Sequence, residues 1–227
     1  MNDLGTVLIT GGASGLGAAT VDAVREAGGR PLVIDRVAPP SDVEHVVADL
    51  ADSAAAEAAV VELAERAGLD AVFTPAGTDA CGPLIEVSTE DWERVVKVNL
   101  LGTAAVVRAA LPYLERSGGT VVTCASTLGL KAVSDATAYC ASKFGVVGFT
   151  RALAAETQGR VGVTMLVPGG MHTAFFDDRD EKYKPPADAK LNNPRDVAAT
   201  VLFALRQPAG CQVRELVVCP AEESSWP

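Results

Sequence analysis

Residues 10–17 read TGGASGLG and follow directly on the apolar run Val7-Leu8-Ile9. Four of these eight residues are glycine, which weakens both strands and helices, so their concentration needs a cause. The apolar run predicts a strand, and the Ala-rich stretch after residue 17 predicts a helix. The glycines therefore form either a tight strand-to-helix turn or a cradle whose backbone N–H groups face a phosphate.

Short apolar runs alternate with helical patterns along the rest of the chain. Ser88 and Asp91 resemble a capping box, and Pro194 suits the first turn of a helix. The expected strands are 6–10, 30–35, 43–48, 69–74, 119–125, 160–167 and 213–219, and the expected helices are 15–28, 53–67, 90–116, 136–157 and 194–207. Nearly continuous apolar strands separated by helices predict an α/β fold. We expect one domain over residues 1–227, a Rossmann-type doubly wound parallel sheet of about seven strands with helices on both faces.

Composition excludes several classes of protein. Hydrophobic residues make up 48% and charged residues 21%, as in ordinary globular proteins. The net charge of −10 argues against a nucleic-acid surface, and no run approaches the ~20 apolar residues of a membrane span. The five cysteines form no CxxC pair and only two histidines are present, so no metal site is expected. We expect a cytoplasmic protein that binds neither nucleic acid nor membrane.

Two acidic residues follow the next expected strands. Asp35 ends the second strand, eighteen residues beyond Gly17, where a carboxylate accepts hydrogen bonds from an adenosine ribose and repels a 2′-phosphate. Asp49 follows the third strand and is placed to meet the adenine edge. A strand, a glycine turn, a helix and an acidic residue in this order are the context that a dinucleotide site requires.

With these residues the chain resembles the short-chain dehydrogenase/reductase family in its single-domain form. The family motif TGxxxGxG is matched by Thr10, Gly11, Gly15 and Gly17, and the likeness runs from about residue 6 to the last expected strand. The resemblance implies an oxidoreductase that uses a nicotinamide cofactor.

The stretch 138–143, AYCASK, carries the pattern Y-x-x-x-K. Tyr139 and Lys143 are four residues apart on an expected helix, so both side chains share one face. Alone the pattern is weak, but Ser126 lies thirteen residues earlier at the end of an expected strand, and Asn99 is a polar residue within an apolar helix. The family's catalytic set of Asn, Ser, Tyr and Lys falls on these four positions.

The chemistry of these residue types supports the same assignment. A free phenol has a pKa near 10, and a neighbouring ammonium together with the charge of oxidised nicotinamide favours phenolate. Tyr139 is then the acid/base, and Lys143 lowers the phenol pKa and holds the nicotinamide ribose. Ser126 hydrogen-bonds the substrate oxygen, and Asn99 anchors a water that passes protons from Lys143 to solvent.

The resemblance also implies the cofactor contacts. Residues 168–173 match the family's PGxxxT segment, whose threonine, here Thr173, holds the nicotinamide carboxamide, while His172 is expected to be a spectator. Asp35 and the neutral Ser14 favour NAD; Arg36 is a basic residue of the kind found there in members that use NADP. The expected cofactor contacts are Gly11, Ser14, Gly15, Leu16, Gly17, Asp35, Arg36, Asp49, Leu50, Ala76, Gly77, Tyr139, Lys143, Pro168, Gly169, Met171 and Thr173.

The substrate end carries weaker signals. Residues 74–77 read TPAG where the family usually has Asn-Ala-Gly, so Pro75 replaces a side chain that ties neighbouring strands together. Residues 174–191, which include a charge-rich stretch, are expected to form a short substrate lid. Trp226 either docks on a partner subunit or frays, and Cys124 is expected to be a small core residue. The expected apolar substrate wall comprises Phe175, Phe176, Tyr183, Leu128, Leu130, Ala132 and Val133.

These observations predict an oxidoreductase that moves a hydride between nicotinamide and a secondary alcohol or ketone, with NAD(H) preferred over NADP(H). The alternatives are an NADP(H)-dependent ketoreductase and a non-catalytic NAD(H)-binding regulator. Such regulators generally lose the tyrosine or lysine, and both are present here. Epimerases and dehydratases of the extended relatives need a C-terminal substrate domain for which 227 residues leave no room. The resemblance implies a homodimer or homotetramer acting on a small alcohol or carbonyl compound.

Overall fold

The computed structural model describes residues 4–40, 42–223 and 225–226. They form one parallel seven-stranded sheet in the order β3-β2-β1-β4-β5-β6-β7. The strands are β1 (Thr6–Thr10), β2 (Arg30–Asp35), β3 (Glu44–Val47), β4 (Ala71–Thr74), β5 (Thr120–Cys124), β6 (Gly162–Pro168) and β7 (Glu215–Val218). The predicted fold class is confirmed, and the seven strands match the predicted ones apart from their ends.

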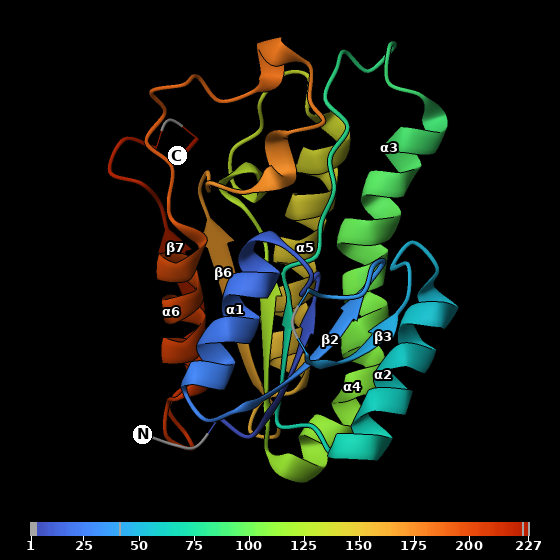
Figure 1. The fold of residues 1–227 in the computed structure, drawn as a ribbon, viewed down its shortest axis with the longest axis vertical. Coiled ribbons are helices and arrows are strands. Elements are labelled where there is room, and N and C mark those ends of the chain that lie inside the picture. The colour runs from blue at the N-terminus through green and yellow to red at the C-terminus, as the bar shows by residue number, and fades with distance from the viewer. Residues whose placement is uncertain (1–3, 41, 224, 227) are drawn as a thin grey trace.

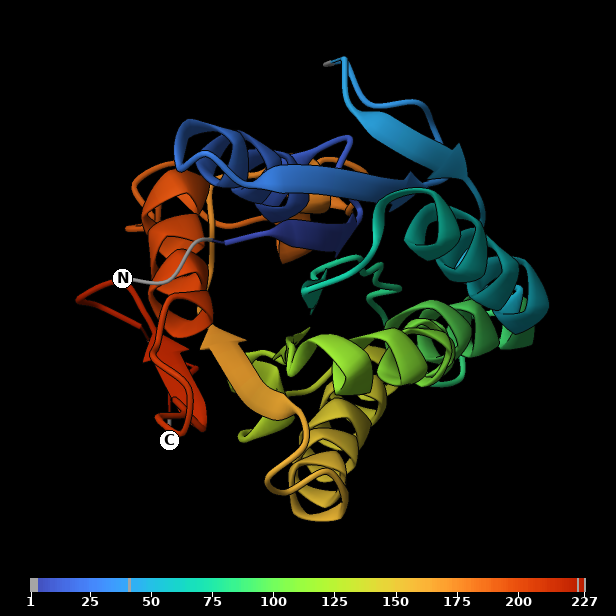
Figure 2. The ribbon, with the colours of Figure 1, turned by 90° about the horizontal axis from the view of Figure 1, so that it is seen from below.

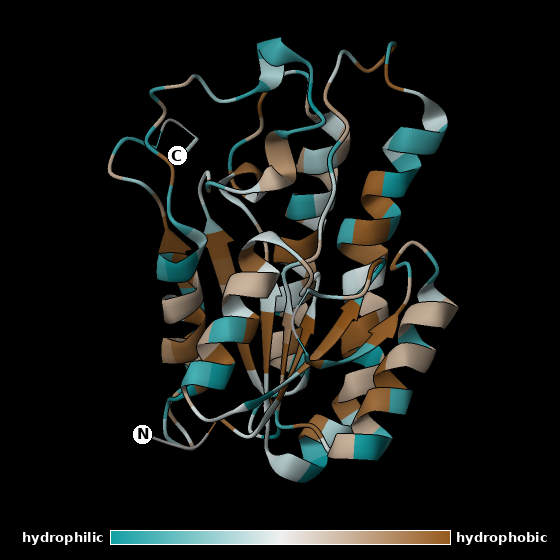
Figure 3. Cartoon of the chain, viewed as in Figure 1, coloured by the Kyte–Doolittle hydropathy of each residue, from teal (hydrophilic) through white to brown (hydrophobic). Residues whose placement is uncertain are grey.

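Helices cover both faces of this sheet (Figures 1 and 2). α1 (Gly15–Glu26) and α6 (Pro194–Leu205) pack on one face, and α2 (Ser53–Ala67), α4 (Thr103–Ser117) and α5 (Thr137–Glu156) pack on the other. Successive strand residues point to opposite faces: Leu8 enters the core under α2 and α4, whereas Val7 and Ile9 enter the core under α1 and α6. Because both faces are buried, the strands are apolar throughout, as the hydropathy colouring shows (Figure 3).

The helix predicted over 90–116 runs from residue 89 to 117 and changes its winding in the middle. α3 (Thr89–Val96) begins at Ser88, whose hydroxyl accepts from the Asp91 N–H at 3.0 Å, so the predicted cap is confirmed. A π-helical segment, Lys97–Gly102, then leads into α4. At Gly102 an added Cβ would lie 2.8 Å from Leu50, so a glycine lets this helix approach the end of β3 closely.

The same helix, Thr89–Ser117, is long and apolar enough to cross a membrane by length and composition. Half of its most apolar stretch is buried within the fold, where Val106, Ala110 and Leu114 pack in the core beside α2. Contacts with the sheet and the neighbouring helix account for the buried half of its apolar residues, whereas Leu101 is exposed.

The order of the strands determines where a cleft forms. From β1 the chain continues to β2 and β3 on one side, then crosses back to β4 on the other side of β1. At such a switch point the connections leave in opposite directions, which opens a crevice at the carboxyl ends of the strands. The turns after β1, β4, β5 and β6 all lie at this end of the sheet.

Candidate active site

A cleft of about 1120 Å³ opens at the carboxyl ends of the strands. Its walls come from the β1–α1 turn, the residues that follow β2 to β6, and segment 174–191. All seventeen residues predicted to contact a cofactor line it. Sequence positions spread over more than 160 residues are thus brought to one cavity.

The glycines of residues 10–17 form the predicted strand-to-helix turn. Gly15 has φ +54°, a left-handed conformation that favours glycine, and a Cβ at Gly17 would lie 2.0 Å from the carbonyl oxygen of Gly11. Ser14 precedes α1 without a side-chain cap, and no acidic residue stands in the helix's first turn. The Gly11 and Ala13 N–H groups are bonded to Ile34 and Asp35, but those at the start of α1 are open to an anion, so the turn fits the diphosphate of a dinucleotide.

Asp35 lies at the end of β2 and faces this turn. Its Oδ2 accepts from the Ala13 N–H at 2.9 Å and its Oδ1 accepts from the Val37 N–H at 3.3 Å. A carboxylate has about four acceptor sites, so room remains for the hydroxyls of a ribose. Arg36, next to it, is exposed and also lines the cleft.

Asp49 and Leu50 follow β3 and line the cleft as well. The Asp49 carboxylate accepts from the Ala51 N–H and from Arg94 Nη2, each at 3.0 Å. Burial raises its pKa, but these hydrogen bonds outweigh burial and the pKa lies below the ordinary value. Asp49 is therefore ionised and already engaged, with free acceptor sites on the cleft side.

Ser126, Tyr139 and Lys143 meet at the centre of the cleft. Ser126 follows β5 and hydrogen-bonds the Tyr139 phenol, which projects from the first turn of α5. One turn further along α5, Lys143 Nζ lies 5.6 Å from the centre of the Tyr139 ring and donates to the Cys124 carbonyl at 2.8 Å. A hydroxyl, a phenol and a buried ammonium thus surround one small volume.

Burial controls the protonation of this group in the protein alone. It raises the pKa of the Tyr139 phenol well above 10, against the lowering effect of the Ser126 hydrogen bond. Burial likewise lowers the pKa of Lys143. The expected depression of the phenol pKa by Lys143 is therefore not seen: desolvation of the phenolate is the largest effect, and the Ser126 hydrogen bond and Arg179 are the groups that lower the pKa.

Asn99 lies in the π-helical segment, behind the cleft rather than on its wall. Its Oδ1 accepts from the Thr78 N–H at 2.8 Å, and its Nδ2 donates to the Thr78 carbonyl at 2.9 Å and to Ser142 Oγ at 3.0 Å. The side chain joins the segment after β4 to α5, next to Lys143. Anchoring of a water by Asn99 stays a prediction.

The segment after β6 crosses the cleft opposite the glycine turn. A Cβ at Gly15 would lie 3.5 Å from the Thr173 methyl group, so Thr173 stands directly beside the start of α1. Met171 lines the cleft, whereas His172 is exposed and does not. This position fits the spectator role predicted for His172.

Segment 174–191, orange at the top of Figure 1, lies beyond the carboxyl ends of the strands. Phe175 packs against the Tyr139 ring with centroids 5.7 Å apart, and Arg179 stacks on the rings of Phe175 and Phe176. Arg179 Nη2 donates to Asp79 Oδ2 at 2.5 Å, and the two side chains are only 18% and 6% exposed. A buried ion pair therefore fastens this segment to the residues after β4.

The predicted apolar substrate wall is wrong in part. Leu128, Phe175, Phe176 and Tyr183 line the cleft, but Leu130, Ala132 and Val133 do not. Leu130 packs instead against the small core between α5 and β6, and Ala132 and Val133 are exposed. The three residues follow the short 3-10 turn Thr127–Gly129, which carries the chain away from the cleft.

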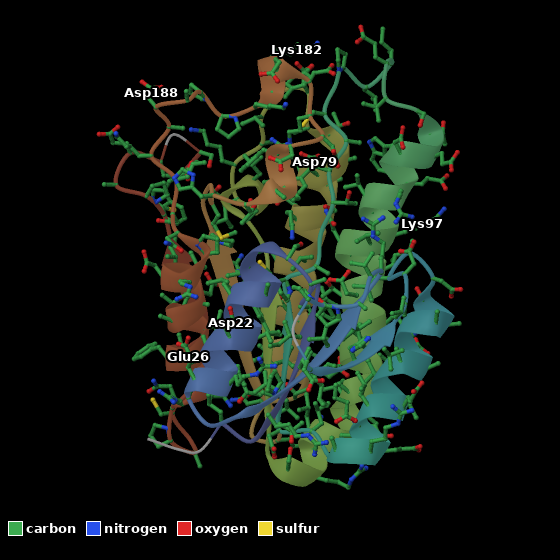
Figure 4. All side chains as sticks on the ribbon, in the orientation of Figure 1. Asp22, Glu26, Asp79, Lys97, Lys182 and Asp188 are labelled. Carbon is green, nitrogen blue, oxygen red and sulfur yellow. The ribbon has the colours of Figure 1, made fainter. Side chains whose placement is uncertain are left out.

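Several lining residues were not predicted. The substrate end of the cleft is more polar than the predicted apolar wall, because four polar residues line it: Asp79, Arg179, Glu223 and Ser225. Figure 4 shows Asp79 and Lys182 among polar side chains at this end of the molecule. Arg179 lay within the charge-rich stretch, which was a usable signal, whereas nothing local marked Glu223. Cys124 is buried in the core as predicted, yet it also contributes to the cleft wall.

Comparisons with known proteins agree with this geometry. D-threitol dehydrogenase of Mycolicibacterium smegmatis is 32% identical over 217 residues, covering 86% of this chain and 84% of that protein. The ligand-free aldohexose dehydrogenase of Thermoplasma acidophilum superposes with a TM-score of 0.88 at 21% identity, covering 96% of this chain and 94% of the other. The alcohol dehydrogenase of Thermococcus sibiricus complexed with 5-hydroxy-NADP superposes with a TM-score of 0.83 at 24% identity. The superposition covers 94% of this chain and 95% of the other.

The family model described as short chain dehydrogenase matches residues 5–184, which hold the glycine turn, Asn99, Ser126 and the Tyr139–Lys143 pair. Members of this family are oxidoreductases that bind nicotinamide cofactors. The protein therefore belongs to the short-chain dehydrogenase family.

Proposed function

We propose that this protein transfers a hydride between a nicotinamide cofactor and a small secondary alcohol or ketone. The observation that carries the proposal is the contact of the Ser126 hydroxyl with the Tyr139 phenol, on the wall of a cleft and beside the buried Lys143. A hydroxyl donor and a proton-transferring phenol 2.6–3.2 Å from one oxygen atom are what alcohol oxidation requires. A regulator that only binds NAD(H) has no use for this arrangement.

The nicotinamide, when bound, accepts or supplies the hydride. Ser126 donates a hydrogen bond to the substrate oxygen and stabilises the charge that develops there. Tyr139 takes the hydroxyl proton in oxidation and returns it in reduction, while the ammonium of Lys143 stabilises the phenolate and binds the nicotinamide ribose. Asn99 holds the segment after β4 and α5 in register, so that Lys143 stays beside Tyr139.

We further propose NAD(H) as the preferred cofactor. The Asp35 carboxylate beside the glycine turn supports this, because a carboxylate can accept hydrogen bonds from the adenosine ribose hydroxyls and would repel a 2′-phosphate. The alternative is NADP(H): Arg36 lines the same end of the cleft, and the Thermococcus sibiricus relative is complexed with 5-hydroxy-NADP. Asp35 is closer to the glycine turn, because it is hydrogen-bonded to Ala13 whereas the Arg36 side chain is exposed.

Segment 174–191 is proposed to be the lid over the substrate. It contacts Tyr139 through Phe175 and is held to the other wall by Arg179. The proposal includes assembly as a homodimer or homotetramer and a single catalytic domain over the chain.

The test of the function is Tyr139→Phe. The change keeps the ring and its contact with Phe175 but removes the proton that must be transferred, so turnover should fall by at least ~10²-fold. Native and variant proteins are assayed on a panel of secondary alcohols and ketones by the absorbance of the reduced nicotinamide, and cofactor binding is measured separately.

Tyr113→Phe serves as the matched control, because Tyr113 lies on α4 beside Arg116 and outside the cleft. Cofactor affinity should be similar in all three proteins. Near-normal turnover by Tyr139→Phe on a substrate that the native protein accepts would show that the phenol is not the acid/base.

A further inference from the structure

The segment after β7 (residues 219–223 and 225–226) folds back over the cleft of its own chain. The Gly170 N–H donates to Glu223 Oε2 at 3.0 Å, two residues beyond the end of β6. Ser225 Oγ lies 2.6 Å from Thr127 Oγ1, and Thr127 directly follows Ser126 at the end of β5. Glu223 and Ser225 both line the cleft. The segment therefore joins the ends of the two neighbouring strands that flank the proposed catalytic centre.

Glu223 is held in the cleft as a carboxylate. Three donors bind it: the Gly170 N–H, the Ser225 N–H at 3.0 Å and the Ser225 hydroxyl at 2.5 Å. Burial raises the pKa of Glu223, but these hydrogen bonds outweigh it and the pKa lies below the ordinary value. No described lysine or arginine is within ion-pair distance of it. With about four acceptor sites and three donors, the carboxylate keeps one site for a ligand.

The charges around Glu223 restrict which ligand group can use that site. Asp79, Glu86, Asp178 and Asp180 also line the cleft, where Arg179 pairs with Asp79 and Lys182 interacts with Glu86 and Asp180. An anionic group at Glu223 would meet a carboxylate that only Ser225 and the Gly170 N–H hold, with no described cation paired to it, and is disfavoured. An ammonium group would share the cleft with the buried Lys143, whereas a neutral hydroxyl donates to Glu223 without adding charge.

The distance between the sites suits a small molecule. Ser126 follows β5, Glu223 is bound at the end of β6, and neighbouring strands lie about 4.8 Å apart. A substituent on a small substrate whose reacting carbon lies at Ser126 can therefore extend along the neighbouring strand end toward Glu223. The Thr127 and Ser225 hydroxyls connect the two positions, because Thr127 follows Ser126 directly and Ser225 binds Glu223.

We propose that Glu223 determines substrate specificity by accepting a hydrogen bond from a second hydroxyl group of the substrate. The protein then acts on polyhydroxy alcohols in preference to monohydroxy alcohols with the same carbon skeleton. This inference rests on the proposed dehydrogenase function and names its substrate class.

The test compares four compounds that share a four-carbon skeleton and a secondary alcohol. Butan-2-ol has one hydroxyl, butane-2,3-diol has a second, 3-hydroxybutyrate carries a negative charge and 3-aminobutan-2-ol a positive charge. We expect the native protein to show a kcat/KM for the diol at least about tenfold higher than for butan-2-ol, the effect of one hydrogen bond to a charged group. The anion should be the poorest of the four.

Glu223→Gln is the informative variant, because the amide oxygen can still accept from Gly170 and keep the segment in place. It should bring the diol/butan-2-ol ratio of kcat/KM close to one, through a rise in KM for the diol that is much larger than any change for butan-2-ol. Glu222→Gln removes the same charge one residue away, from an exposed side chain outside the cleft, and should keep the native ratio.

Three outcomes overturn the inference while leaving the proposed function intact. The first is that the native protein turns over butan-2-ol and the diol equally well. The second is that it prefers either charged compound. The third is that Glu223→Gln lowers kcat/KM for all four compounds by the same factor. Absence of turnover of every compound with either cofactor would overturn the proposed function and this inference together.

Discussion

At the scale of single residues, function depends on how burial and hydrogen bonds place charge. Tyr139 is half-buried on the cleft wall, and desolvation raises the pKa of its phenol, whereas Lys143 is fully buried and its pKa is lowered. Asp35 and Glu223 are carboxylates kept in place by backbone N–H groups rather than by cations. Each therefore retains acceptor sites for a ligand.

The protonation of Tyr139 is directly measurable. Its folded-state pKa is raised above the ordinary value of 10.0, so its contribution to stability is present below about pH 10 and is lost as pH rises through the folded pKa. In the cofactor-free protein, the difference in phenolate absorbance between native and Tyr139→Phe should show no step below about pH 10. Oxidised nicotinamide brings a positive charge and should move the step to lower pH. A step near neutral pH without cofactor would contradict the dominance of burial.

Cofactor choice is a second prediction at this scale. Asp35→Asn keeps an acceptor for the Ala13 N–H but removes the negative charge, and Asp35→Ser also shortens the side chain. Both should raise the NADP/NAD ratio of kcat/KM, because the repulsion of a 2′-phosphate is lost and Arg36 gains a phosphate to pair with. Steady-state kinetics with both cofactors checks this. A higher kcat/KM of the native protein with NADP, or an NADP/NAD ratio that neither substitution changes, would show that Asp35 does not determine the choice of cofactor.

At the scale of elements, segment 174–191 is unusual in being tied down by a buried ion pair. Arg179 bonds Asp79 across 100 residues of sequence, and Tyr183 donates to Asp135 at 3.1 Å. Loops of this kind are ordinarily solvated and mobile. The contacts hold the segment over Tyr139 in the structure.

Arg179→Met should release this segment. The variant keeps apolar contact with Phe175 and Phe176 but leaves the Asp79 carboxylate buried without its partner, an unfavourable state that opening relieves. We expect thermolysin to cut within 174–191 at least about tenfold faster than in the native protein, with cleavage sites read by mass spectrometry.

Arg195→Met removes an exposed arginine from the start of α6 and should leave the rate unchanged. Cofactor and substrate together should protect the native segment further if it is the lid. Equal cleavage of native protein with and without ligands would argue against that role.

At the scale of the whole molecule, stability comes from one sheet buried on both faces. Phe73 in the central strand β4 is fully buried beneath α1 and α6, whereas Val47 on the edge strand β3 is 57% exposed. Most of the ion pairs lie between partly exposed side chains and contribute little. The core, rather than the surface, therefore carries the free energy of unfolding.

Phe73→Ala should lower the free energy of unfolding by about 3–5 kcal/mol, because it removes apolar contacts and leaves a cavity. Val47→Ala should change it by no more than about 0.5 kcal/mol. Urea denaturation followed by circular dichroism measures both. Equal losses in the two variants would mean that the two faces of the sheet are not the main source of stability.

The sequence by itself determined the strands, most of the helices, the glycine turn and the positions of Ser126, Tyr139 and Lys143. These features arise from short-range causes: alternation of side chains in a strand, helical spacing, the steric freedom of glycine and capping at Ser88. Their order along the chain also fixes the carboxyl end of the sheet as the place where they meet.

Only the tertiary structure decided the polar substrate end. Asp79 meets Arg179 and Thr127 meets Ser225 across 100 and 98 residues, and no periodic pattern marks such contacts. The same holds for the turn that carries Leu130, Ala132 and Val133 away from the cleft and for the π-helical winding around Asn99. Irregular segments take their paths from packing against the finished sheet, so their contacts follow from the whole fold rather than from local residue preferences.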